Sequence, residues 1–121
     1  MPLIFITTNL SKDKVPDNFI SEFAEEVAHI MKKPIQVVTV AIRTDVQMFR
    51  FGSTDPAAVV MVRDLQPFDN PERNKKTSSG IINFVVEGLK LSPNRINTVM
   101  LPEDANCIGL GDGSLLSEKQ H

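Results

Sequence analysis

Leu3-Ile4-Phe5-Ile6-Thr7-Thr8 follows directly on Met1-Pro2 at the start of this chain. The run consists mostly of β-branched and aromatic residues, and the turn-prone Asn9 comes next, so it predicts a buried β-strand. This strand begins almost at the amino terminus, which is unusual for a globular protein. It places Pro2 at the head of a sheet.

A helix and a second strand are predicted to follow. Apolar residues recur at three-and-four spacing from Phe19 to Met31, which is typical of an amphipathic helix, and Asp17 is the expected cap. Pro34 prevents the helix from continuing. Residues 37–42 are rich in Val and Ile and predict the second strand, and residues 43–55 are expected to be irregular.

The second half of the chain repeats this order. Residues 57–62 predict a third strand, and Asn70-Pro71-Glu72 has the signature of a helix start, with Asn70 as the cap. The helix is expected to run to about residue 90, where Ser92-Pro93 ends it. Residues 96–101 then predict a fourth strand.

Two strand-helix-strand repeats predict an α+β fold in which one four-stranded sheet carries both helices on one face. The small residues Thr77, Ser78 and Gly80 are expected to let the second helix pack closely on that sheet, although Gly80 and Gly88 each cost about 1 kcal/mol relative to alanine. The strands are apolar on both sides, so the open face requires cover, which we expect a closed ring of subunits to supply. The segment from Gly109 to Gly113 is expected to form a turn and an edge strand that pairs with a neighbouring subunit.

Composition argues against several classes of function. The 121 residues suit one domain, and 13 Lys plus Arg against 15 Asp plus Glu leave no basic patch for nucleic acid. Cys107 is the only cysteine, so an intramolecular disulfide is impossible, and we expect its side chain to be buried as a small apolar group. The apolar start is too short for a signal peptide or a membrane span, so we expect a cytoplasmic protein with no membrane partner.

Neither a metal nor a cofactor is expected. His29 falls on the polar face of the first helix and is expected to be solvated, and His121 is terminal. Neither histidine has carboxylates or a second histidine at metal-ligand spacing, and no glycine pattern of the phosphate-binding kind follows a strand.

Pro2 is the candidate catalytic residue. Removal of Met1 is favoured by a small second residue and would leave a secondary amine at the head of the first strand. A free α-amino group has a pKa of about 7.7 to 8.0, which burial or a nearby cation lowers. A neutral amine would be a suitable base for proton transfer next to a carbonyl, the step in keto-enol tautomerisation. Lys33 is the expected cation, which would also hold a substrate carboxylate or enolate oxygen.

These residues resemble the macrophage migration inhibitory factor and D-dopachrome tautomerase family from Pro2 to about Leu115. The resemblance rests on segments in family order and spacing, namely Pro2, Thr8-Asn9-Leu10, Val15-Pro16, Lys33-Pro34, Gly52-Ser53-Thr54-Asp55-Pro56, Leu91-Ser92-Pro93-Asn94-Arg95-Ile96 and Ile108-Gly109. It implies one tautomerase domain over residues 1–116 and a homotrimer with active sites at subunit interfaces. The polar tail, residues 117–121, is expected to be disordered.

The resemblance also implies roles for individual residues. It makes Pro2 the catalytic base toward phenylpyruvate-like or dopachrome-like substrates, which are small aromatic keto acids. It places Lys33 and Leu65 at substrate-binding positions and Ile108 in the lining of an apolar pocket.

Three pocket positions depart from the family pattern. Asn97 stands in place of a pocket tyrosine, Val99 in place of a ligand-contacting asparagine, and Leu110 in place of a pocket tryptophan. The mouth of the substrate site is therefore expected to be more aliphatic. A family cysteine pair is also replaced, by Ala57 and Val60, so thiol redox chemistry is not expected.

Two functions remain open. The first is a keto-enol tautomerase that uses Pro2. The alternative is a secreted, cytokine-like signalling protein with a vestigial tautomerase pocket, which leaves the cell without a signal peptide and is recognised by a cell-surface receptor.

Overall fold

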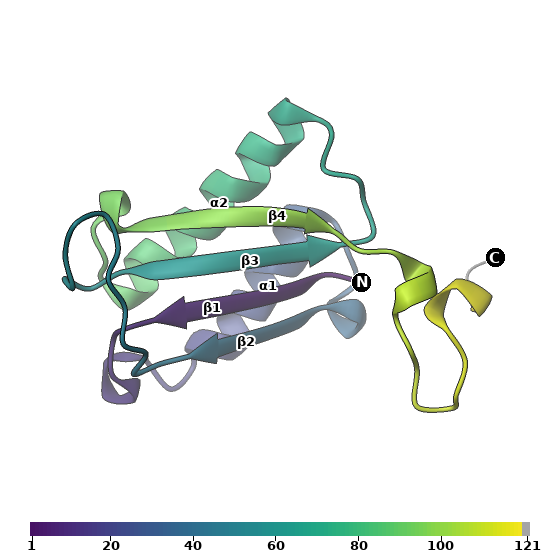
Figure 1. Cartoon of the computed structure of the whole chain (residues 1–121), viewed down its shortest axis with the longest axis horizontal. Helices are drawn as coiled ribbons and strands as arrows, with labels where there is room; N and C mark the ends of the chain where they lie inside the picture. The colour runs from purple at the N-terminus through teal and green to yellow at the C-terminus, as the bar shows by residue number, and fades with distance from the viewer. Residues whose placement is uncertain (120–121) are drawn as a thin grey trace.

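The computed structural model describes residues 1–119, and its strands and helices follow one another in the predicted order (Figure 1). The sheet has the strand order β2-β1-β3-β4, in which β1 runs parallel to β2, β3 runs parallel to β4, and β1 is antiparallel to β3. The two repeats therefore join through their first strands. The elements are β1 (Leu3–Thr8), α1 (Phe19–Met31), β2 (Thr39–Arg43), β3 (Ala58–Asp64), α2 (Pro71–Leu89) and β4 (Ile96–Pro102).

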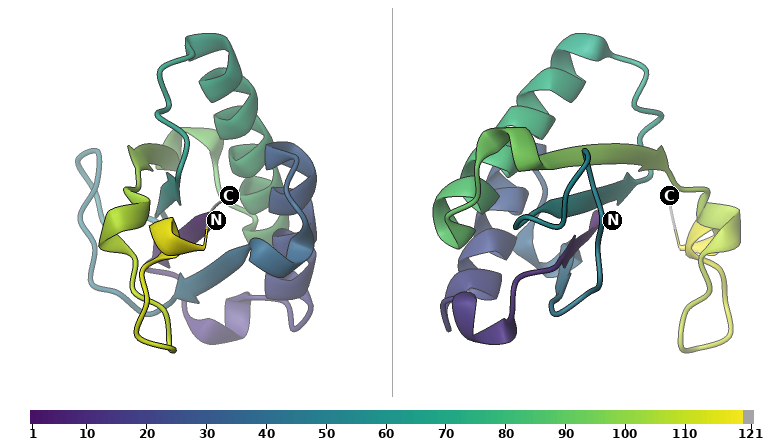
Figure 2. Two further views of the ribbon diagram at one scale, coloured as in Figure 1. Left: turned by 90° about the vertical axis from the view of Figure 1, so that its right-hand side faces the viewer. Right: turned by 60° about the vertical axis from the view of Figure 1, so that its left-hand side comes forward.

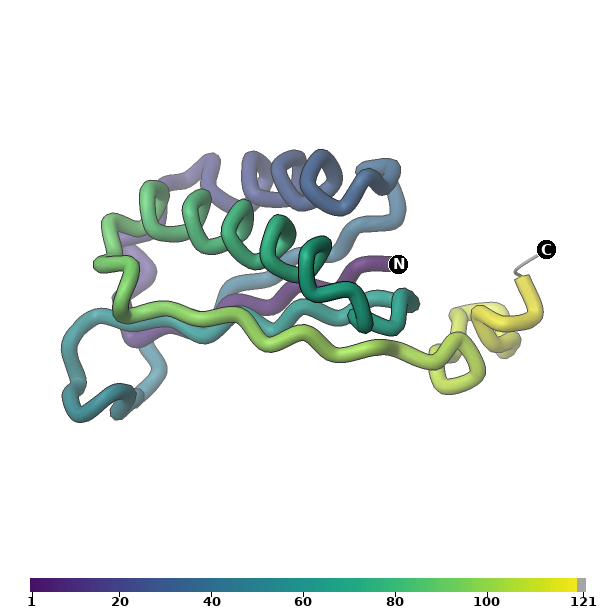
Figure 3. Tube along the Cα trace, turned by 90° about the horizontal axis from the view of Figure 1, so that it is seen from above, coloured from purple at the N-terminus to yellow at the C-terminus, as the bar shows by residue number. Residues whose placement is uncertain are grey.

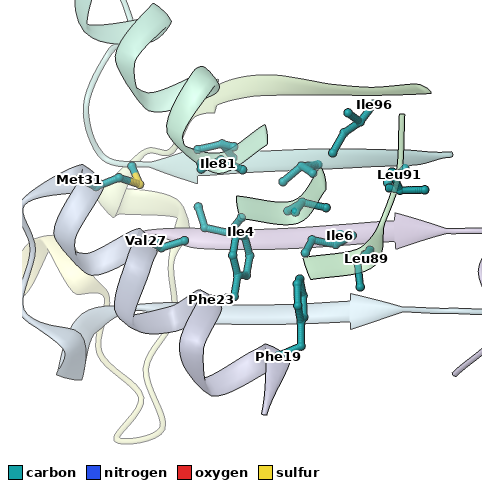
Figure 4. Close-up of a cluster of buried hydrophobic side chains, with 14 residues drawn as sticks. Ile4, Ile6, Phe19, Phe23, Val27, Met31, Ile81, Leu89, Leu91 and Ile96 are labelled. Carbon is teal, nitrogen blue, oxygen red and sulfur yellow. The ribbon is translucent and has the colours of Figure 1, made fainter. Parts of the chain in front are cut away.

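Both helices lie on the same face of the sheet, as the repeat predicts (Figure 3). The core forms between these layers, where side chains from β1 and β3 meet the apolar stripe of α1 and α2 (Figure 4). Phe19 and Phe23 of α1 contact Phe84 of α2, and the ring centroids of the three lie 5.6 to 5.7 Å apart. Alternation along the strands decides which side chains enter this core.

Several predicted boundaries are wrong by one or two residues, as at β3, which spans Ala58–Asp64 where the sequence predicts residues 57–62. Asn18, not Asp17, caps α1, and its side chain binds Glu22 Oε1 at 2.7 Å instead of a backbone N–H. β2 begins at Thr39 because residues 35–37 form a 3₁₀ turn. The predicted cap of α2 is confirmed, since the Asn70 side chain accepts a hydrogen bond from the Arg73 backbone N–H at 3.1 Å.

The predicted packing on the sheet is confirmed at Ser78, whose hydroxyl lies 2.8 Å from the Thr98 hydroxyl on β4. It is wrong at Gly80, which faces α1, as Gly88 also does. A Cβ atom at Gly80 would lie 2.8 Å from Ile30 Cδ1, and one at Gly88 would lie 2.7 Å from Phe19 Cε1. Both distances are shorter than a methyl group tolerates. The glycines therefore set how closely the two helices approach.

Nothing within residues 1–119 forms a layer over the other face of the sheet (Figure 3). An apolar row crosses its centre, because Phe5 pairs with Ala41 on one side and with Met61 on the other, and Met61 pairs with Val99. Phe5 and Val99 are 39% and 38% exposed. A row of this kind is what the predicted ring of subunits would cover.

The loop between β2 and β3 is held by two residues from other parts of the chain. The Asn9 side chain donates to the carbonyl oxygens of Thr54 and Asp55 at 3.0 and 3.1 Å. The Arg95 guanidinium donates to the carbonyl oxygens of Arg50 and Asp55, both at 2.8 Å. Asn9 and Arg95 thus fix the loop that precedes β3.

The segment after β4 projects past the end of the sheet, clear of the helices (Figure 2, right). Its predicted turn is present, and an antiparallel bridge between Gly109 and Leu115 closes it within the chain. Cys107 is exposed, so its predicted burial is wrong, because it lies on a 3₁₀ turn beyond the core.

The first residues of the predicted tail are not disordered, since Lys119 Nζ lies 3.0 Å from the Asp112 carboxylate. His121 lies outside the described residues. No helix within residues 1–119 has the length and apolar character to cross a membrane.

Candidate functional site

The head of β1 is buried in the sheet. Pro2 is fully buried, and its carbonyl oxygen accepts a hydrogen bond from the Thr39 N–H at 2.9 Å, one residue before the parallel pairing of β1 with β2 begins. Pairing of Leu3 with Arg63 places Asp64 across from Pro2 on β3. Because Met1 precedes Pro2 here, the free amine belongs to Met1.

Asp64 receives this amine. Its Oδ1 atom lies 3.1 Å from the Met1 nitrogen and accepts the Leu65 N–H at 2.8 Å, while its Oδ2 atom accepts the Gln66 side-chain amide at 3.0 Å. The Asp64 side chain is 1% exposed, the lowest value for a carboxylate in any ion pair of residues 1–119. A buried carboxylate with these donors is well satisfied.

Asp64 is ionised despite its burial. Desolvation acts to raise its pKa, but the hydrogen bonds from Gln66 and Leu65 and the contact with the terminal ammonium together outweigh it and hold the pKa of Asp64 below its ordinary value. The terminal amine therefore lies beside a fixed negative charge. Sequence reasoning expected a cation there.

Lys33 lies on the other side of Gln66. It is exposed after α1, and together with Gln66 it lines a cleft of about 450 Å³ between the end of α1 and the start of α2. The cleft carries four cations and one carboxylate, namely Lys32, Lys33, Arg73, Lys76 and Glu72. Gln66 thus connects the electropositive cleft to Asp64 and the amine.

Leu65 and Ile108 lie toward the same end of the sheet. Leu65 directly follows β3 and is half-buried, and its backbone N–H is occupied by Asp64. Ile108 is half-buried at the base of the C-terminal turn, where its carbonyl oxygen accepts the Leu116 N–H at 2.8 Å.

Within one chain, Asn97 and Val99 do not lie near Pro2. Asn97 pairs with Val59, five residues along β3 from Asp64, which at roughly 3.3 Å per residue is a separation of about 16 Å. Both side chains face the open side of the sheet, whereas Asp64 faces the helices. The Asn97 side chain accepts a hydrogen bond from the Arg50 guanidinium.

Asp64 and Gln66 were missed from the sequence. One signal was present: Asp64 continues the alternation of Ala58, Val60 and Val62, all buried toward the helices, so period two places its carboxylate on the buried face. The contact with the amine depends on strand register, which the residues of β3 alone do not reveal.

Comparison with known proteins shows the family of this chain. Residues 1–117 match the family described as macrophage migration inhibitory factor (MIF). The chain belongs to the MIF family. It is 31% identical to D-dopachrome decarboxylase-B of Xenopus laevis over 109 residues, which cover 90% of this chain and 92% of that protein. It is 28% identical to macrophage migration inhibitory factor of Meriones unguiculatus over 96 residues, or 79% of this chain and 83% of that protein.

A solved MIF-family structure has the same fold. The macrophage migration inhibitory factor of Trichinella spiralis superposes with a TM-score of 0.85 at 27% identity, covering 93% of this chain and 98% of that one. The predicted family and fold are therefore confirmed.

Proposed function

We propose that this MIF-family chain is a keto-enol tautomerase of the phenylpyruvate or dopachrome type, in which Pro2, freed of Met1, is the general base. The observation that carries the proposal is the burial of Pro2 at the head of β1, where the Thr39 N–H holds its carbonyl oxygen and strand pairing on both sides begins at Leu3. Loss of Met1 would leave the terminal nitrogen on this held residue. A base that abstracts a carbon-bound proton needs such fixed geometry. Relatives named D-dopachrome decarboxylase support a substrate of the dopachrome type.

The charge of the neighbouring cleft supports an acidic substrate. Lys33 would hold the carboxylate of a small aromatic keto acid or the oxygen of the developing enolate, and Arg73 and Lys76 add to the positive potential. No cofactor is required for a proton transfer between carbon and oxygen. Leu65 and Ile108 would supply apolar surface beside the substrate.

A homotrimer would complete the site. Asn97 and Val99 lie about 16 Å and 10 Å along the sheet from the level of Pro2, so they would contribute to the pocket of a neighbouring subunit instead of their own. The uncovered apolar row through Phe5 and Val99 supports an assembly that buries this face.

The test is tautomerisation of phenylpyruvate and of a dopachrome ester by tag-free protein whose loss of Met1 is checked by mass. Pro2→Gly should abolish turnover while keeping the fold, because glycine supplies a primary amine of different basicity and geometry. Full activity in Pro2→Gly, or no activity in the processed wild type, would contradict the proposal.

A second candidate function is extracellular signalling. The replacement of aromatic and polar pocket residues by Asn97, Val99 and Leu110 favours it, since these changes weaken a tautomerase pocket without touching the outer surface of the subunits. A cell-surface receptor would then bind the assembled protein, which would act both in the cytoplasm and outside the cell. Persistent cell binding by an inactive Pro2→Gly protein would support this role, and binding that disappears with turnover would argue against it.

A further inference from the structure

The electropositive cleft carries more charge than the proposed keto acid would use. It lies where the end of α1 and the start of α2 come together at one end of the helical layer (Figure 3). Within a volume of about 450 Å³ it is lined by four cations, namely Lys32, Lys33, Arg73 and Lys76, and by one carboxylate, that of Glu72. The cleft thus has three positive charges in excess, and a monocarboxylate substrate on Lys33 would balance one of them.

The protein itself does not neutralise this charge. None of the four cations belongs to an ion pair within residues 1–119, where the salt bridges have other basic partners. Glu72 lies 3.8 Å from Lys75, which is not part of the cleft lining. A cleft lined by charges of one sign concentrates its electric field, so it attracts ions of the opposite sign. An anion that enters this cleft would displace no internal partner.

A buried hydroxyl without a partner also lines the cleft. Thr77 is 5% exposed, and the other buried polar side chains, Thr8 and Asp64, have their hydrogen bonds filled. The Thr77 hydroxyl forms no hydrogen bond within residues 1–119, although buried polar groups normally do. In the same part of the chain, Arg50 Nε is the one unpaired polar side-chain atom that is fully enclosed. The Thr77 hydroxyl is therefore open to the cleft, where a ligand could bind it.

Phosphoryl groups suit this set of donors. Each carries a charge of about −1.5 to −2 at neutral pH and three strong acceptor oxygens, so two of them balance the excess charge of the cleft. Arg73 can bind a phosphate through two parallel N–H donors. The first turn of α2, which begins at Pro71, adds positive potential at the same place.

We propose that the cleft binds a small molecule with two or more phosphoryl groups, which Arg73 and Lys76 hold by charge and to which the Thr77 hydroxyl donates a hydrogen bond. Binding itself is independent of the tautomerase activity. Because Lys33 borders the same cleft, the bound molecule would compete with an acidic substrate. This competition, and only this part of the inference, rests on the proposed function.

Isothermal titration calorimetry of the full chain with inorganic tripolyphosphate tests the binding. The wild type should bind this probe with a Kd below about 1 mM, and citrate, a carboxylate of similar charge, should bind at least about tenfold more weakly. Lys76→Gln and Thr77→Val should each raise the Kd for tripolyphosphate by about five- to tenfold. Lys90→Gln is the control, because Lys90 lies at the other end of the 19-residue α2, about 28 Å along the helix, and its Kd should equal that of wild type.

Three results would overturn the proposed site: no binding of tripolyphosphate to the wild type, citrate binding of equal strength, or equal Kd values for Lys76→Gln and Lys90→Gln. Lys76 is exposed, so its variant decides the matter if Thr77→Val fails to fold.

Enzyme kinetics test the competition separately. Tripolyphosphate should raise the KM for phenylpyruvate and leave kcat unchanged, and a KM that stays constant while the probe is bound would contradict the competition. Binding of tripolyphosphate to an inactive protein would refute the tautomerase proposal and leave the phosphoryl site intact. Turnover by a protein that does not bind the probe would refute the site and leave the tautomerase proposal intact.

Discussion

The Phe19 ring lies against Gly88 so closely that a Cβ atom there would be 2.7 Å from Cε1 and 2.9 Å from Cδ1. The ring is buried and stacks on Phe23 at 5.7 Å, so it has little room to turn. Gly88 thus brings α2 against a rigid part of α1. Gly80 makes the equivalent approach to the flexible tip of Ile30.

Gly88→Ala should therefore destabilise the protein. Overpacking against a ring that cannot move costs about 1 to 3 kcal/mol, more than offsetting the roughly 1 kcal/mol that alanine gains in a helix. Gly80→Ala is the matched control, because rotation of the Ile30 tip relieves its clash, and its free energy of unfolding should stay within about 1 kcal/mol of wild type. Urea unfolding of both variants measures the difference, and equal stabilities would contradict this account.

Ser114 should control the ionisation of Asp112 in the C-terminal turn. Hydrogen bonds from the Ser114 hydroxyl and N–H, and then from Lys119, lower the pKa of Asp112 to about 2. In Ser114→Ala this pKa should rise toward the ordinary value of about 3.9. The rise in Lys119→Ala should be smaller, because that contact contributes less. Carboxyl ¹³C NMR of Asp112 measures both.

The same lowered pKa predicts how the turn responds to acid. The pKa of Asp112 is about 2 in the folded protein and about 3.9 in the unfolded chain, so the ionised carboxylate stabilises the folded turn. This stabilisation is fully present at pH values above the unfolded pKa. The stabilisation is lost as the pH falls through the folded pKa. The protection factor of the Ser114 amide, which is its exchange rate relative to that of an unfolded chain at the same pH, should fall over that interval and stay constant above it, because this N–H donates to Asp112.

Val99→Asp should prevent assembly. The substitution places a carboxylate in the exposed apolar row of the sheet, where burial without a partner costs several kcal/mol, or about 2 to 7 for a polar group even when uncharged. Sedimentation should give a 13.4 kDa monomer for this variant and a larger species for wild type. Asn83→Asp, a change of the same charge on the exposed outer face of α2, should leave assembly unaffected.

Lys33→Ala should reduce kcat/KM for an acidic keto substrate by about ten- to a hundredfold, because a hydrogen bond to a charged group contributes about 1.5 to 3 kcal/mol. Lys90→Ala is the control. Lys90 ends α2 in the left-handed conformation as Lys32 ends α1, with φ of 56° and 55°, but it lies at the opposite end of the sheet from the cleft. An equal loss of kcat/KM in Lys33→Ala and Lys90→Ala would mean that Lys33 acts only through the overall charge of the surface.

Local sequence patterns determined most of the architecture. Period-two and period-3.6 apolar spacing specified four strands, two helices and their repeat, because each pattern reports which side of an element is buried. Capping chemistry was reliable at Asn70, where proline follows, and failed at Asp17, where Asn18 competes for the same role. The position of Pro2 at the head of a buried strand was also local information.

Tertiary structure alone decided what surrounds the amine and how the helices meet. Asp64 contacts the amino terminus because of the register between β1 and β3. Gly88 contacts Phe19 because of the way in which α2 packs against α1. The distance of Asn97 from Pro2 likewise follows from its place along β4. Such contacts join residues far apart in the chain. The spacing of apolar residues within one segment does not reveal which residues of another segment will contact it.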